Sequence, residues 1–109
     1  ASDAQGHIVG RGDLVAQFEQ VLSNLGAVVK AAGGTLQDIV KLNIFVADLK
    51  AYRTHLKPLG EVFRAHFDSY YPAMGLFEVS GFFREEALVE LEGLAVIGAN
   101  DADRHKETR

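Results

Sequence analysis

The sequence predicts an α+β fold in which two helices pack on one face of a mixed β-sheet. Two observations lead to this prediction: the hydrophobic pattern follows the order helix, strand, helix, strand, strand, and 48% of the 109 residues are hydrophobic. This length and apolar share suit one packed domain, which we expect over residues 1–98. Cysteine is absent, which excludes a disulfide framework, a thiolate nucleophile and a cysteine-ligated zinc site.

A long amphipathic helix is expected after Asp13. From Leu14 to Ala32, apolar residues recur every three or four positions, which is the spacing of one face of a helix of about five turns. Asp13 suits the N-cap, because its carboxylate can accept hydrogen bonds from the free amides of the first turn. Gly33 and Gly34 are expected to end the helix, since glycine adopts the left-handed conformation without steric cost.

A half-buried strand is expected over residues 39–46, which are rich in β-branched and aromatic residues. Side chains of a strand alternate between its two faces. The alternation predicts Val40, Leu42, Ile44 and Val46 on one face and Ile39, Lys41, Asn43 and Phe45 on the other.

A second helical region is expected after this strand. Asp48 suits the N-cap of a short helical turn, and Pro58 suits the first turn of a longer helix, where its missing amide has no partner to lose. Tyr71 precedes Pro72 and is therefore disfavoured in the helical region, which ends this helix. Its buried stripe is predicted to comprise Leu59, Val62, Phe63 and Phe67.

Two further strands are expected, over Met74–Ser80 and Ala87–Ile97. Residues Gly81–Glu86 between them have a polar tip and predict a hairpin connection. Residues 99–109 are charged with little to bury, so we expect a flexible charged tail there.

Composition and spacing weigh against several classes of function. The net charge of −4 gives no general attraction to nucleic acid or an anionic membrane, and no apolar run has the length of a membrane span. We therefore expect a cytoplasmic protein that has neither a nucleic acid nor a membrane as its partner. No pair of histidines has the spacing of a metal-binding helix, so no metal and no cofactor is expected; the histidines are His7, His55, His66 and His105.

Four segments, in order, carry a family resemblance. They are LGAVVKAAGG (25–34), LQDIVKLNIFVADL (36–49), YPA (71–73) and VELEGLAV (89–96). Together they resemble the Rid family, also called YjgF-like or endoribonuclease L-PSP-like proteins and often labelled enamine/imine deaminases. The resemblance implies a chorismate-mutase-like fold and a homotrimer, in which sheets enclose a central barrel and clefts between subunits hold a small-molecule ligand.

The resemblance also assigns roles to single residues. In deaminating members an arginine after Pro-Ala binds the substrate carboxylate, and Met74 stands at that position here. Glu90 matches a glutamate that orders the attacking water and is the expected catalytic residue. Leu76 stands where a small polar residue or cysteine is common, and Gly60 where some members have asparagine. Methionine has no charge and no hydrogen-bond donor, so this pocket is expected to be more apolar than in a 2-aminoacrylate deaminase.

Two functions remain open from the sequence. The first is a hydrolytic deaminase of an enamine or imine, using Glu90, with counter-charge supplied by Arg84 or Arg53, which are candidates by charge alone. The second is a non-catalytic trimer that binds an apolar or neutral small ligand or a protein partner. The family opens with a hairpin that should already have ended where Ala1 stands, so we expect this hairpin to be absent from the chain. Either these residues are omitted, which we favour because three strands would cover two helices poorly, or the sheet is built from fewer strands.

Overall fold

Helix α1 (Leu14–Ala31) begins and ends where the sequence predicts, in a computed structural model that describes residues 1–98. The Asp13 carboxylate caps the helix by accepting a hydrogen bond from the Ala16 amide at 3.0 Å. Gly33 follows the helix with φ +95°, a left-handed conformation that glycine adopts freely. The charged tail expected at 99–109 lies outside the described residues. The face of α1 that is buried comprises Leu14, Gln17, Phe18, Val21, Leu22 and Val29.

Strand β1 (Ile39–Val46) follows a short 3₁₀ turn, η1 (Leu36–Asp38), and has the predicted bounds. The predicted faces are wrong at its start. Ile39 is fully buried and Val40 is 43% exposed, because the pairing register shifts between Ile39 and Lys41. Such an irregularity moves every residue before it to the opposite face of the sheet.

Two helices follow β1, as expected. Helix α2 (Leu49–Thr54) begins at Asp48, whose carboxylate accepts a hydrogen bond from the Ala51 amide at 3.1 Å. Helix α3 (Leu56–Phe67) carries Pro58 in its first turn, and Asp68 ends it with φ +55°. The predicted stripe of α3 is buried at Leu59, Phe63 and Phe67 and half-buried at Val62.

Strands β2 (Ala73–Glu78) and β3 (Val89–Ala95) both pair with β1 and not with each other. The predicted hairpin is therefore wrong: β2 is parallel to β1 on one side, and β3 is antiparallel on the other. The chain crosses the end of β1, where the Val79 amide donates to Val46 and the Ala47 amide donates to Leu88. This order places β3 over α1 and buries Val89. If β3 instead formed a hairpin with β2, α1 would have no strand to cover.

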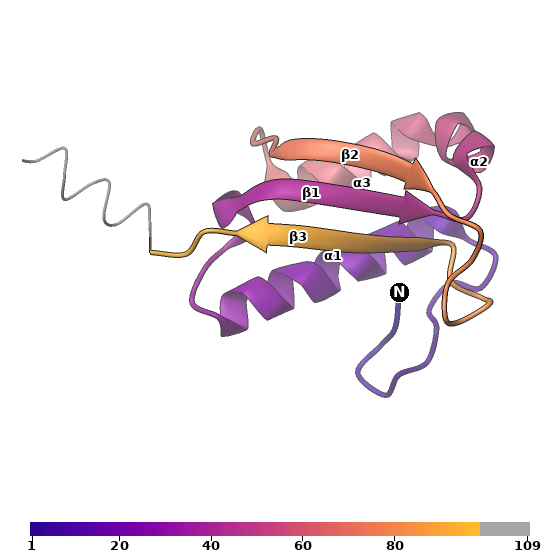
Figure 1. Cartoon of the computed structure of the whole chain (residues 1–109), viewed down its shortest axis with the longest axis horizontal. Helices are drawn as coiled ribbons and strands as arrows, with labels where there is room; N and C mark the ends of the chain where they lie inside the picture. Colours follow the sequence, from indigo (N-terminus) through magenta and orange to yellow (C-terminus); the bar gives the residue numbers. More distant parts are fainter. Residues whose placement is uncertain (99–109) are drawn as a thin grey trace, which may run out of the picture.

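The helices cover one face of the sheet and leave the other uncovered (Figure 1), which confirms the predicted α+β fold with helices on one side. By register, the uncovered face carries Asn43 and Phe45 from β1, Phe77 from β2, and Glu92 and Leu94 from β3. Phe45 stacks on Phe77, and the Asn43 amide donates to a Glu92 carboxylate oxygen at 3.0 Å. Within residues 1–98, no helix has both the length and the apolar character needed to cross a membrane.

Candidate functional site

Two of the residues that the sequence singles out, Met74 and Gly60, line the same cavity. It measures about 160 Å³ and lies where α2 and α3 meet the edge strand β2. Met74 is 47% exposed because β2 is an edge strand, so only one side of it is covered by a neighbouring strand. We call this hollow the Met74 cavity; its lining residues are Ile44, Tyr52, Leu56, Leu59, Gly60, Phe63, Arg64, Tyr71 and Met74.

The strand register explains how Met74 reaches this cavity. Met74 lies opposite Leu42, a fully buried residue, and so faces the helices rather than the uncovered side of the sheet. Leu76, two residues later, lies opposite Ile44 and shares that face, but it does not line the cavity. The Phe63 and Tyr71 rings are nearly parallel, with centroids 5.5 Å apart, and give the cavity a flat aromatic side.

The Met74 cavity also contains a cation that sequence reasoning missed. Arg64 comes from α3, four residues after Gly60, and this spacing on a helix is the sequence signal that places the two residues side by side. The two arginines considered from sequence lie elsewhere. Arg84 donates to the Gly6 carbonyl at 2.8 Å, and Arg53 is an exposed residue of α2 that does not line the cavity.

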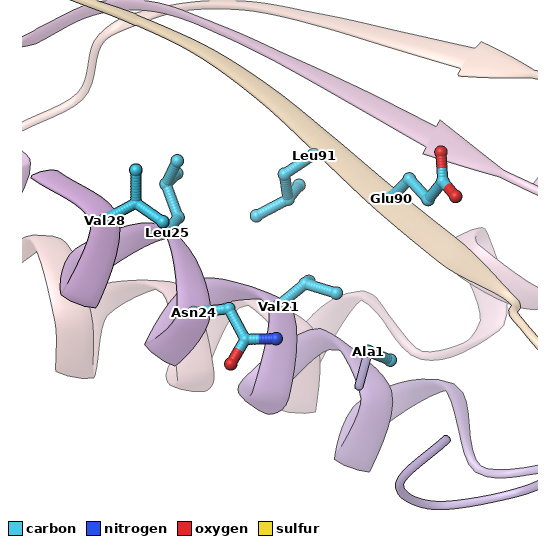
Figure 2. Close-up of a pocket in the computed structure, with 7 residues that line it drawn as sticks. All are labelled: Ala1, Val21, Asn24, Leu25, Val28, Glu90 and Leu91. Atoms are coloured by element: carbon cyan, nitrogen blue, oxygen red, sulfur yellow. The ribbon is translucent and has the colours of Figure 1, made fainter. Parts of the chain in front are cut away.

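Glu90 lies in a second hollow, a groove of about 280 Å³ between α1 and β3. Figure 2 shows Leu91 turned toward the α1 side chains, while the Glu90 carboxylate extends away from Leu91. Glu90 is exposed. We call this hollow the Glu90 groove; its lining residues are Ala1, Val21, Asn24, Leu25, Val28, Glu90 and Leu91.

Polar groups of the Glu90 groove are partly engaged with the N-terminal segment. The Asn24 amide donates to the Ser2 carbonyl at 2.8 Å and its oxygen accepts from Gln20 at 2.8 Å. Among residues 1–98, no group of three histidine or acidic side chains is arranged to hold a metal ion.

Glu90 and Met74 are held apart within one chain. Met74 pairs with Leu42 on one side of β1, whereas Glu90 pairs with Phe45 on the other. Ordinary strand dimensions separate the two positions by about 10 Å along the sheet and about 10 Å across it. They also belong to opposite faces, because Leu42 lies under the helices and Phe45 on the uncovered side. A single chain therefore cannot bring both side chains to one small molecule.

The fold agrees with comparisons to known proteins. A solved Rid-family protein of unknown function from Yersinia pestis superposes with a TM-score of 0.79 at 31% identity, covering 89% of this chain and 72% of that protein. A solved member of the YjgF/YER057c/UK114 family from Mycobacterium tuberculosis gives a TM-score of 0.70 at 31% identity, covering 81% and 70%.

The curated relatives have names that refer to activity or family. The mouse 2-iminobutanoate/2-iminopropanoate deaminase is 32% identical over 87 residues, which is 80% of this chain. A RutC family protein from Pyrococcus horikoshii is 33% identical over 90 residues, covering 83% of this chain and 67% of that protein. This chain spans only 61% of the mouse protein.

A family model matches most of the chain. The model described as Endoribonuclease L-PSP matches residues 1–97, which include α1, the three strands and both hollows. The resemblance carried by the four sequence segments is thereby confirmed, and the chain belongs to the Rid family, the YjgF-like or endoribonuclease L-PSP proteins.

Proposed function

We propose that this protein hydrolyses a small imine or enamine metabolite, with Glu90 orienting and deprotonating the attacking water. The observation that carries the proposal is an exposed carboxylate at the position of the family's glutamate, in a chain 32% identical to a mouse protein named 2-iminobutanoate/2-iminopropanoate deaminase. The cysteine-free sequence fits the cytoplasmic setting that we propose for it.

The proposed reaction needs one residue that can accept and return a proton. The water oxygen bonds to the imine carbon as the Glu90 carboxylate takes a proton from that water. The carboxyl group delivers this proton to the nitrogen, which gives a carbinolamine. The carboxylate then takes the proton of the new hydroxyl group and passes it to the nitrogen as the carbon–nitrogen bond breaks, so that a carbonyl compound and ammonia leave.

We propose that the working site forms between subunits of a homotrimer. A substrate that contacts both Glu90 and the Met74 cavity has to bridge two chains, because one chain holds these positions on opposite faces of its sheet. The uncovered face supports association, since it exposes Phe77 and Leu94, and Asn43 Oδ1 is buried there without a hydrogen-bond partner among residues 1–98. In this arrangement the uncovered faces line the central barrel.

A second function is favoured by Met74 itself. Without a charged donor at this position, the cavity has an apolar side where deaminating relatives of this family bind a carboxylate. A trimer that binds an apolar or neutral small ligand without turning it over, or that binds a protein partner, is the alternative function.

The test measures ammonia release from imines formed in the assay by an amino acid oxidase acting on a panel of amino acids. We expect the wild-type protein to accelerate release, and Glu90→Gln to lower the rate about 100-fold, as expected for loss of a general base. Glu92→Gln is the matched control, since it removes a carboxylate two residues along the same strand, and its rate stays near wild type. Size-exclusion chromatography confirms that both variants keep the same oligomeric state.

The possible results separate the two functions. No acceleration by the wild-type protein contradicts the enzyme and favours the binding protein. Acceleration that survives Glu90→Gln contradicts the role assigned to Glu90.

A further inference from the structure

The Arg64 guanidinium lies beside the Met74 cavity and has no acidic partner among the residues that the structure describes. The ion pairs within residues 1–98 are His7–Asp3, Arg11–Glu86 and His66–Glu19, and none of them involves Arg64. No hydrogen bond of its side chain is formed within the same part of the chain, although Glu61 and Asp68 lie within one turn of it. An arginine carries five N–H donors in a fixed planar arrangement, and here all five are available.

Gly60 gives this guanidinium its position. A Cβ atom on Gly60 would lie 3.3 Å from Arg64 Nη1 and 3.9 Å from both Cζ and Nη2. The planar group therefore lies over the bare backbone of α3, on the side that lines the cavity. Any larger residue at position 60 would crowd it.

Tyr52 places a second free donor in the same cavity. Its hydroxyl makes no hydrogen bond to the described part of the chain, although its ring is half-buried against Phe18. Burial raises the pKa of Tyr52 above 10.0, so the hydroxyl stays protonated and neutral at physiological pH. The cavity thus contains two donor side chains, those of Arg64 and Tyr52, that have no partner in the described part of the chain.

The remainder of the lining is apolar or aromatic and includes no carboxylate. The Phe63–Tyr71 pair offers a flat surface, and Met74 and Leu56 offer aliphatic contact. A ligand that matches these groups has a small apolar body and one negatively charged, planar acceptor. A phosphate matches less well, because its larger charge and hydration call for more donors than one arginine and one tyrosine supply.

We infer that the Met74 cavity binds a small carboxylic acid with an apolar body and that Arg64 holds its carboxylate. This inference rests on the proposed function, in which the same cavity receives the substrate. Arg64 then supplies the counter-charge that Met74 cannot. It does so from helix α3, across the cavity from the strand position where the family resemblance places an arginine.

Binding is measured without turnover, by NMR titration of the full chain with 2-oxobutanoate and butanoate. Butanamide, which has nearly the shape of butanoate but no charge, tests the role of the carboxylate. We expect Arg64→Leu to weaken 2-oxobutanoate and butanoate binding about tenfold, as for loss of a charge-assisted pair, and to change butanamide binding less than about twofold. Arg64→Lys keeps the charge but not the paired donors, and restores part of the affinity.

Arg53→Leu is the matched control, because it removes the same charge from an exposed residue of α2 outside the cavity. We expect its affinity for both carboxylates to equal that of wild type. Equal binding of butanoate and butanamide by wild type, an unchanged affinity in Arg64→Leu, or tighter binding of inorganic phosphate than of butanoate each contradicts the carboxylate site. Thermal melting checks that each variant is folded. We expect Arg64→Leu to melt near the wild-type temperature, because Arg64 is exposed and contributes little to the core.

The two proposals fail in different ways. If Glu90→Gln abolishes ammonia release but Arg64→Leu leaves carboxylate binding unchanged, the carboxylate site is wrong and the enzyme stands. If no imine is hydrolysed but carboxylates bind through Arg64, the enzyme is wrong and the binding site stands.

Discussion

Two polar side chains of this protein, Gln17 and Arg64, have opposite environments. Gln17 is fully buried on the inner face of α1, and every polar atom of its amide is used. Its nitrogen donates to the carbonyls of Gly10 at 3.2 Å and Glu86 at 2.9 Å, and its oxygen accepts from the Leu88 amide at 2.7 Å. Arg64 has five donors at a cavity and no partner for any of them within residues 1–98.

The difference separates a structural role from a binding role. A buried polar group stabilises a fold only when its hydrogen bonds are made within the protein, and Gln17 makes them to two loops that lie outside the helices and strands. Through Gln17, the segment before α1 is joined to the segment before β3. Donors that remain free beside a cavity contribute nothing to the fold and are available to a ligand.

Gln17→Leu tests the structural half of this comparison and has the largest expected effect. Leucine has a similar volume but leaves the Glu86 carbonyl and the Leu88 amide without the partner that Gln17 provides, at about 1 kcal/mol each or more, whereas the Gly10 carbonyl still accepts from the Asp13 amide at 2.8 Å. We expect the free energy of unfolding to fall by about 2 kcal/mol, measured by urea denaturation. Gln37→Leu is the control, because Gln37 is exposed and its hydrogen bond to Phe67 is long at 3.4 Å. Equal stability of the two variants would show that the loops do not depend on Gln17.

Local signals in the sequence predicted most of the fold. Asp13 and Asp48 cap their helices as expected, and the bounds of β1 are correct, because each depends on residues within a few positions. The order of the strands was predicted wrongly, since nothing local to 81–86 indicates that α1 needs β3 above it. The shift at Val40 was missed for the same reason: the alternation of hydrophobic residues continues unbroken through it.

The candidate site was predictable only in part. Met74 and Gly60 were expected in one pocket and do line one cavity. Arg64 was not found, because a helix of this composition carries several exposed charges and the sequence does not show which of them has a partner. The distance between Glu90 and Met74 depends on strand order, which the local pattern does not contain.

Gly60→Ala tests how Arg64 is held, and its expected effects are of intermediate size. We expect stability to rise and carboxylate affinity to fall. Alanine stabilises a helix by about 0.5–1 kcal/mol relative to glycine, so the free energy of unfolding should rise. The new Cβ would lie 3.3 Å from Arg64 Nη1, so the guanidinium has to shift by a few tenths of an ångström, and we expect carboxylate affinity to fall by up to about threefold. Gly26→Ala in α1 is the matched control, because its Cβ would make only ordinary contact with Leu36 at 3.7 Å. A Gly60→Ala protein that binds butanoate as wild type does would contradict the placement of Arg64.

Tyr52→Phe has the smallest expected effect. Together with Tyr70→Phe, it repeats with two tyrosines the comparison drawn between Gln17 and Arg64. The Tyr70 hydroxyl donates to the Ile39 carbonyl, whereas the Tyr52 hydroxyl has no partner within residues 1–98. Tyr70→Phe should therefore cost about 1 kcal/mol of stability, and Tyr52→Phe less than about 0.5 kcal/mol at pH 7.

The two tyrosines should also differ at alkaline pH. Because burial raises the pKa of folded Tyr52, its contribution to stability is fully present below the ordinary value of 10.0 and is lost as the pH rises toward the folded value. Tyr52→Phe should remove this part of the alkaline decline in melting temperature and weaken butanoate binding about twofold, as expected for a hydroxyl that serves the ligand rather than the fold. A Tyr52→Phe variant as destabilised at pH 7 as Tyr70→Phe would place the Tyr52 hydroxyl with Gln17, among the groups that hold the structure together.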